Sequence, residues 1–243
     1  MAGWLKRLFG GGGEDTDAVK LDPPDVMEDR MEQTRLADLA AWQALKAAGP
    51  LPKKITRPQI ETVLRERGFV KKPNEGESYF RKDLPDRYFI LRIQLKSLSG
   101  TEDYAPSQRL LVSPNFCTHD YSVIETEVLG DLAIDPATMV NLGQRRFKEV
   151  ILTSKRVEDI LTEVEEALLK INPSDVLEEF CAYPPSRPGS GGIRHLCGLV
   201  CLDHVDRLDG YLEQRVRGND CGFMPYITDD MIARAAQIGH RNG

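Results

Sequence analysis

The chain has 243 residues, of which 41% are hydrophobic and 29% charged, which is an ordinary composition for a globular protein. Its formal net charge is −6 at pH 7, whereas nucleic-acid-binding proteins normally show a basic excess, so the charge argues against nucleic acid as a partner. The imbalance is local, because residues 14–38 contain nine acidic and three basic residues. No segment approaches the roughly 18 consecutive apolar residues of a membrane span.

Five cysteines bear on the redox compartment. Their number is odd, and the first residues show neither the apolar region nor the small-residue cleavage site of a secretory signal. A disulfide framework is therefore not expected, and reduced thiols in a cytoplasmic protein are the simpler interpretation. The cysteines are Cys117, Cys181, Cys197, Cys201 and Cys221.

Residues 1–22 are predicted to be a flexible tail with a short amphipathic start. Four apolar side chains would share one face of two helical turns, opposite Lys6 and Arg7, ahead of the glycine run at 10–13. Two turns do not sustain a helix in water unaided, so this start is either a weak membrane-surface or partner anchor or a floppy end. The four apolar residues are Trp4, Leu5, Leu8 and Phe9.

Residues 23–49 are predicted to form an N-terminal helix. Pro23 and Pro24 suit its first turn, and Gly49 and Pro50 end the helical pattern. A loose apolar stripe along it favours a flap docked on the rest of the protein over a helix that binds a partner. The stripe consists of Met27, Met31, Leu39, Trp42 and Leu45.

Residues 53–172 are predicted to be the core domain, and a helix at 55–68 marks its beginning. Thr56 and Gln59 have the spacing of a capping box. Gly68 supplies the left-handed residue with which many helices end. The domain therefore starts with a helix, and the segment before it is separate.

Alternating patterns after this helix predict a sheet. In the clearest strand, 87–97, apolar and polar side chains alternate, which predicts one face in the core, one in water and antiparallel pairing. An amphipathic helix at 155–171, with Ser154 as its cap, closes the domain. The polar side chains of the clearest strand are Arg92, Gln94 and Lys96, and further strands are predicted at 79–82, 109–113, 121–129 and 147–152.

Residues 173–243 are predicted to be a C-terminal helical region. Pro173 opens a short helix that ends near Cys181, and helices at 193–216 and 228–240 would form a hairpin. The order of elements along the chain predicts an α+β fold: a mainly antiparallel sheet covered by helices, followed by a C-terminal helical hairpin.

Cys117 and His119 are weak candidates for catalysis. A cysteine nucleophile needs a base that converts it to a thiolate, and His119 is close in sequence. Catalytic groups, however, are normally gathered from residues distant in sequence. The competing interpretation, a polar loop after a strand, is favoured.

Cys197, Cys201 and His204 are weak candidates for a metal site. Their spacing of i, i+4 and i+7 places them on one face of the predicted helix at 193–216, as zinc ligands can be. The same face continues through apolar residues to Leu212, and buried cysteine behaves as a small apolar side chain. Core packing is favoured, and no metal or other cofactor is predicted.

The order of elements in residues 55–171 is a helix, three or more antiparallel strands, a further strand and a closing helix. This order resembles bacterial α+β domains of the secretion-chaperone kind. The resemblance implies an acidic cytosolic protein that binds segments of partner proteins as a homodimer, and it assigns no functional residue.

The sequence shows no convincing catalytic constellation, and it carries an acidic N-terminal arm suited to a basic partner surface. We therefore expect a non-enzymatic module that binds another protein, as an adaptor, a secretion-chaperone-like protein or a toxin-neutralising protein. The alternative is a small cytosolic hydrolase or transferase that uses Cys117 or His119.

Overall fold

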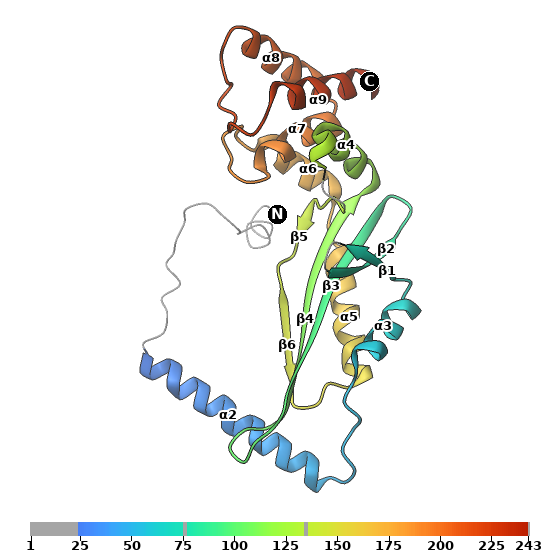
Figure 1. The fold of residues 1–243 in the computed structure, drawn as a ribbon, viewed down its shortest axis with the longest axis vertical. Coiled ribbons are helices and arrows are strands. Elements are labelled where there is room, and N and C mark those ends of the chain that lie inside the picture. The colour runs from blue at the N-terminus through green and yellow to red at the C-terminus, as the bar shows by residue number, and fades with distance from the viewer. Residues whose placement is uncertain (1–23, 75–76, 134–135, 243) are drawn as a thin grey trace. The chain divides into compact units, whose positions relative to one another are not determined.

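The computed structural model describes residues 24–74, 77–133 and 136–242 (Figure 1). The predicted tail with Trp4, Leu5, Leu8 and Phe9 lies outside these residues. The helices are α2 (Pro24–Ala47), α3 (Arg57–Glu66), α4 (His119–Leu129), η1 (Gly130–Leu132, a 3₁₀ helix), α5 (Ser154–Leu169), α6 (Pro173–Ala182), α7 (Gly191–Cys201), α8 (Val205–Val216) and α9 (Asp229–Asn242).

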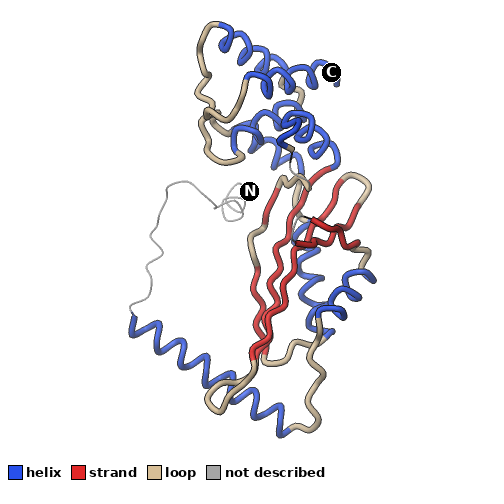
Figure 2. The backbone as a smooth tube through the Cα atoms, viewed as in Figure 1, coloured by secondary structure: helices blue, strands red, loops and turns tan. Residues whose placement is uncertain are grey.

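The strands form one sheet, drawn in red in Figure 2. They pair in the order β1–β2–β3–β4–β5, and β6 also pairs with β4. Both β5 and β6 run antiparallel to β4. The predicted α+β class with an antiparallel sheet and helices is confirmed. The strands are β1 (Val70–Asn74), β2 (Glu77–Asp83), β3 (Arg87–Leu98), β4 (Ser107–Thr118), β5 (Val140–Asn141) and β6 (Arg145–Glu149).

The chain divides into two compact units, each assembled from stretches that are separate in the sequence. Of the described elements, four contribute residues to both units: β2, β3, β4 and α5. Unit 1 consists of the described residues within 1–80, 91–113 and 142–163, and unit 2 of those within 81–90, 114–141 and 164–243.

In unit 1 the predicted start of α3 is confirmed. The Gln59 side-chain oxygen accepts hydrogen bonds from the Thr56 N–H and from the Thr56 hydroxyl, both at 2.9 Å. Gly68 has a φ of 85°, the left-handed conformation that the C-terminal signal required. The helix buries an apolar face formed by Ile60, Val63 and Leu64.

A buried side-chain amide links two backbone segments in the core of unit 1. Gln108 of β4 is 2% exposed. Its Nε2 donates to the Ile55 carbonyl at 3.0 Å, and its Oε1 accepts from the Leu152 N–H at 3.1 Å. Buried polar groups need such partners, so Gln108 holds the segments before α3 and α5 together.

One face of the unit 1 sheet lies against α5, as Figure 1 shows. Arg145 and Glu149 of β6 form ion pairs with Glu163 and Arg156 of α5, at 3.3 and 2.9 Å. The apolar stripe predicted for this helix is fully buried, at Val157, Ile160, Leu161, Val164 and Leu168. The N-cap of α5 is Thr153 instead of Ser154, since the Thr153 hydroxyl accepts a hydrogen bond from the Arg156 backbone N–H.

In unit 2, α6 and α7 approach each other closely at Gly198. A Cβ added at Gly198 of α7 would lie 2.9 Å from the Phe180 Cβ of α6, so only glycine allows this approach. The predicted C-terminal hairpin is confirmed, because α8 and α9 pack together. Thr228 caps α9, because its hydroxyl accepts from the Met231 N–H at 3.3 Å.

The prediction of a strand at 121–129 is wrong, because these residues belong to the helix α4. The Thr118 hydroxyl accepts from the Tyr121 N–H at 3.2 Å and caps the helix. Tyr121, Ile124 and Val128 are buried at helical spacing. Val123 would be buried in a strand of alternating faces, yet it is 57% exposed.

The single helix predicted at 193–216 is two helices, α7 and α8. Asp203 between them has a φ of 58°, and the His204 N–H donates to the Leu199 carbonyl at 2.8 Å. This pattern ends a helix and usually uses glycine, so an aspartate there gave no stop signal in the sequence.

The strand predicted at 87–97 is confirmed as β3, but its wet face is shorter than predicted. Polar and apolar residues alternate as expected from Arg92 onward. Before that, Tyr88 and Ile90 are buried as well as Phe89 and Leu91. The Tyr88 hydroxyl donates to the Ala137 carbonyl at 3.1 Å, so the segment before β5 covers what was expected to face water.

Candidate functional site

An open groove in unit 1 lies between α2 and the loop that joins β3 to β4. Its volume is about 590 Å³. Met31 and Arg35 of α2 line one side, and the strand ends and their loop line the other. The principal residues of that second side are Leu98, Tyr104, Arg109 and Lys148.

The groove exposes large apolar side chains to solvent. Met31 is 71% exposed, Leu98 53% and Tyr104 59%. Exposed apolar residues are ordinary when scattered, but a group of them around one depression is typical of an interaction site.

Polar contacts hold α2 beside the β3–β4 loop. The Arg35 guanidinium donates to the Asp103 carbonyl at 2.7 Å and lies 5.7 Å from the centre of the Tyr104 ring. Asp38 forms an ion pair with Lys148 of β6. These polar groups connect α2 to the β3–β4 loop and to β6, while Met27 and Met31 of its apolar stripe stay exposed.

The charged groups of the groove are mostly cationic. Its lining contains four cations and one carboxylate, Asp38. Asp38 is engaged with Lys148, and Arg35 is paired with Glu32 on the same helix. The groove thus offers apolar surface within a rim of positive charge, which suits binding. The four cations are Arg30, Arg35, Arg109 and Lys148.

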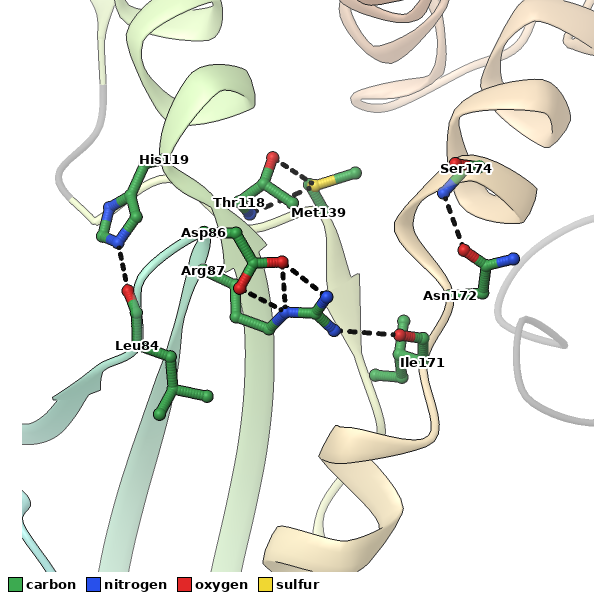
Figure 3. Close-up of polar contacts among 9 residues, drawn as sticks. All are labelled: Leu84, Asp86, Arg87, Thr118, His119, Met139, Ile171, Asn172 and Ser174. Carbon is green, nitrogen blue, oxygen red and sulfur yellow. Dashed lines mark hydrogen bonds and ion pairs between the residues drawn. The ribbon is translucent and has the colours of Figure 1, made fainter.

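The sequence candidates for catalysis lie in unit 2 and face different partners. Cys117 is buried at the end of β4, and burial raises the pKa of its thiol to about 12. Its Sγ donates to the Thr118 carbonyl at 3.4 Å. His119 begins α4, and its Nε2 lies 2.9 Å from the Leu84 carbonyl oxygen (Figure 3). The Cys117 thiol is therefore neutral at physiological pH, and the His119 imidazole is hydrogen-bonded to a backbone carbonyl instead of to that thiol.

A cleft of about 480 Å³ in unit 2 collects three carboxylates and a cysteine. Asp86 is paired with Arg87 at 2.6 Å, which lowers the pKa of the carboxyl, and Arg87 also donates to the Ile171 carbonyl (Figure 3). Burial raises the pKa of Cys201 to about 12. The cleft therefore presents carboxylates and a neutral thiol. Its carboxylates are Asp86, Asp120 and Asp203.

The sequence candidates for metal binding do not share one helix face. Cys197 is fully buried in α7, where burial raises its pKa, Cys201 ends that helix, and His204 follows the break at Asp203. Across the described ranges, no three histidine, cysteine or acidic side chains are grouped so that they could hold a metal ion.

A further histidine, His195, is fully buried in α7. Its Nδ1 lies 3.1 Å from the Phe180 carbonyl oxygen and its Nε2 3.0 Å from the Tyr211 hydroxyl. A carbonyl only accepts, so Nδ1 carries the proton and Nε2 accepts from Tyr211. Burial lowers the pKa of the imidazole to about 4, so it is neutral and joins α6, α7 and α8.

The groove residues escaped the sequence reasoning. Met31 belongs to the predicted apolar stripe of residues 23–49 and Lys148 to the predicted strand at 147–152, but nothing in the sequence linked the two. Tyr104 and Arg109 showed no motif at all. The available signal was the presence of cations at alternating positions of separate strands. Whether these cations lie side by side on one surface can be told only once the strand register is known.

Comparison with known proteins identifies one family. The model of DUF6990, a family of unknown function, matches residues 56–239. No curated protein matches the chain. No solved structure matches it either. Because the match spans well over half of the sequence, the chain belongs to the DUF6990 family.

Proposed function

We propose that the chain is a non-enzymatic protein-binding module that takes a segment of a partner protein into the groove of unit 1. The observation that carries the proposal is the exposure of Met31, Leu98 and Tyr104 around one open depression. Adaptor, secretion-chaperone-like and toxin-neutralising roles all use such a surface. The resemblance of residues 55–171 to secretion chaperones is in line with the proposal.

The proposal includes a cytoplasmic location. All five cysteines are free, and thiols persist in reducing compartments. Separately, none of the helices in the described ranges has an apolar stretch long enough to traverse a bilayer.

The alternative, a hydrolase or transferase that uses Cys117 or His119, has less support from the geometry. A cysteine nucleophile works as its thiolate, and burial favours the neutral thiol of Cys117. His119 contacts the Leu84 carbonyl instead of that thiol.

The test is capture of the partner by the full chain in its native host, followed by measurement of the affinity of the purified pair. Leu98→Ser removes an apolar side chain from the groove. Burying a leucine in an interface contributes about 1.5–3 kcal/mol, so we expect a loss of roughly tenfold or more. Leu132→Ser is the matched control, because Leu132 is 64% exposed and belongs to unit 2. Equal affinity of both variants and the wild type would contradict the proposal.

A further inference from the structure

The open face of the unit 1 sheet, opposite the face that lies against α5, is rich in positive charge. Side chains alternate along a strand, and Leu110 and Val112 are fully buried on the covered side. The residues between and beside them therefore occupy the opposite side, where Leu111 is buried and Arg109 is exposed. We call this surface the basic face, and its cations are Arg92, Lys96, Arg109, Arg146 and Lys148.

The basic face is continuous with the groove. Leu98 belongs to the open side of β3 and Arg109 to that of β4, and both line the groove. The strand positions on this face within β3, β4 and β6 of unit 1 include no carboxylate. The acidic group that reaches it is Asp38 of α2, at Lys148.

The strand register places like charges against each other. Arg109 of β4 is directly opposite Lys148 of β6, and Arg146 is opposite Leu111 two positions away. Like charges directly opposite on a sheet are destabilising. Asp38 pairs with Lys148 and offsets part of this repulsion, and a negatively charged ligand over Arg109 and Arg146 would offset the rest.

We infer that the partner segment is acidic, with apolar side chains in the groove and carboxylates over the basic face. This inference rests on the proposed function and specifies its partner. An acidic polypeptide fits better than a nucleic acid. Single-stranded nucleic acids stack successive bases on exposed aromatic rings, whereas the strand positions of the basic face in the described chain carry none and the groove lining supplies only Tyr104.

The test is selection of peptides from a random 12-residue display library on the full chain. We expect the enriched peptides to combine several aspartates or glutamates with apolar residues. Their affinity should fall when the salt concentration is raised from 50 to about 300 mM, because exposed charges are screened. Lys96→Glu, Arg109→Glu and Arg146→Glu together should weaken binding of the same peptides at least tenfold.

A matched control variant has the same change in net charge at three other lysines. Lys72→Glu, Lys155→Glu and Lys170→Glu replace three exposed lysines outside the strand positions that define the basic face and should leave peptide affinity within twofold of the wild type. Melting curves of both triple variants show whether each is folded. If the face variant does not fold, Lys96→Gln alone replaces it, with a smaller loss expected.

Several outcomes would overturn the inference. Enrichment of neutral or basic peptides, or no enrichment at all, would contradict the proposal of an acidic partner. Binding of a single-stranded RNA oligomer that is lost in the face variant would assign the face to nucleic acid. A wild-type dimer that dissociates in that variant would assign it to a second copy. If Leu98→Ser weakens partner binding and the face variant does not, the proposed function stands and this inference fails.

Discussion

The two units differ in where their most distinctive titratable residues lie. In unit 2, Cys117, Cys197 and His195 are buried among packed helices and strands. Their pKa values shift toward the neutral form, upward for the thiols and downward for the imidazole. In unit 1, Arg109 and Arg146 stay exposed and charged on one face.

This difference suggests different roles for the buried groups of unit 2 and the exposed cations of unit 1. A buried neutral group with its hydrogen bonds made holds the fold together. On the exposed basic face of unit 1, Lys148 pairs with Asp38 of α2, whereas Arg109 and Arg146 are left to suit an anionic ligand. Cys117, Cys197 and His195 thus occupy buried positions in unit 2, and the surface that we propose for binding consists of residues from α2, the β3–β4 loop and the strands.

The largest expected effect tests whether His195 is structural. The unfolded imidazole has its ordinary pKa near 6.5 and the folded one a pKa of about 4. Between these values only the unfolded chain binds the proton, so the stability contributed by neutral His195 is present above pH 6.5 and is lost as pH falls toward 4. The loss is on the order of 3 kcal/mol.

Urea unfolding of the wild type and His195→Gln from pH 7 to pH 4.5 measures this loss. Other titrating groups cancel in the difference between the two proteins. We expect the difference in unfolding free energy to shrink as the pH falls. A pH-independent difference would show that His195 is not held neutral by the fold.

A second prediction concerns the close approach of α6 and α7. Gly198→Ala places a Cβ 2.9 Å from the Phe180 Cβ, and overpacking of this kind costs about 1–3 kcal/mol. Gly210→Ala in α8 meets nothing within 4 Å, and replacing a helical glycine should stabilise by about 0.5–1 kcal/mol. Thermal unfolding of the two variants should give shifts of opposite sign, and shifts of the same sign would contradict the packing described.

The smallest effect concerns the basic face. Arg109→Glu replaces repulsion with attraction across the strand pair to Lys148, and should stabilise the free chain by about 0.2–1 kcal/mol. The same change should weaken partner binding. Urea unfolding checks the first effect, with Arg109→Gln expected to lie between the two proteins. A loss of stability would mean that Arg109 has a structural role.

Much of the fold could be predicted from the sequence, because its signals were local. The capping box at Thr56 and the buried stripe of α5 depend only on neighbouring residues, and both are confirmed. α4 was missed because apolar residues at 121–129 suit either period, and Thr118 was not recognised as a cap. The break at Asp203 was missed because aspartate seldom takes a left-handed conformation.

The groove and the basic face could not be predicted, for a different reason. Arg109 and Lys148 are 39 positions apart in the sequence, and only the antiparallel register of β4 and β6 makes them neighbours. The apolar stripe of α2 was visible, but its exposure beside Tyr104 depends on contacts between distant segments.

The most direct measurement is the affinity of one acidic peptide from the selection for the wild type, the face variant and the matched lysine control. We predict that the face variant binds at least tenfold more weakly, that the control binds like the wild type, and that added salt weakens the wild type toward the face variant. Equal affinity of all three proteins at low salt would contradict the assignment of the basic face to an acidic partner.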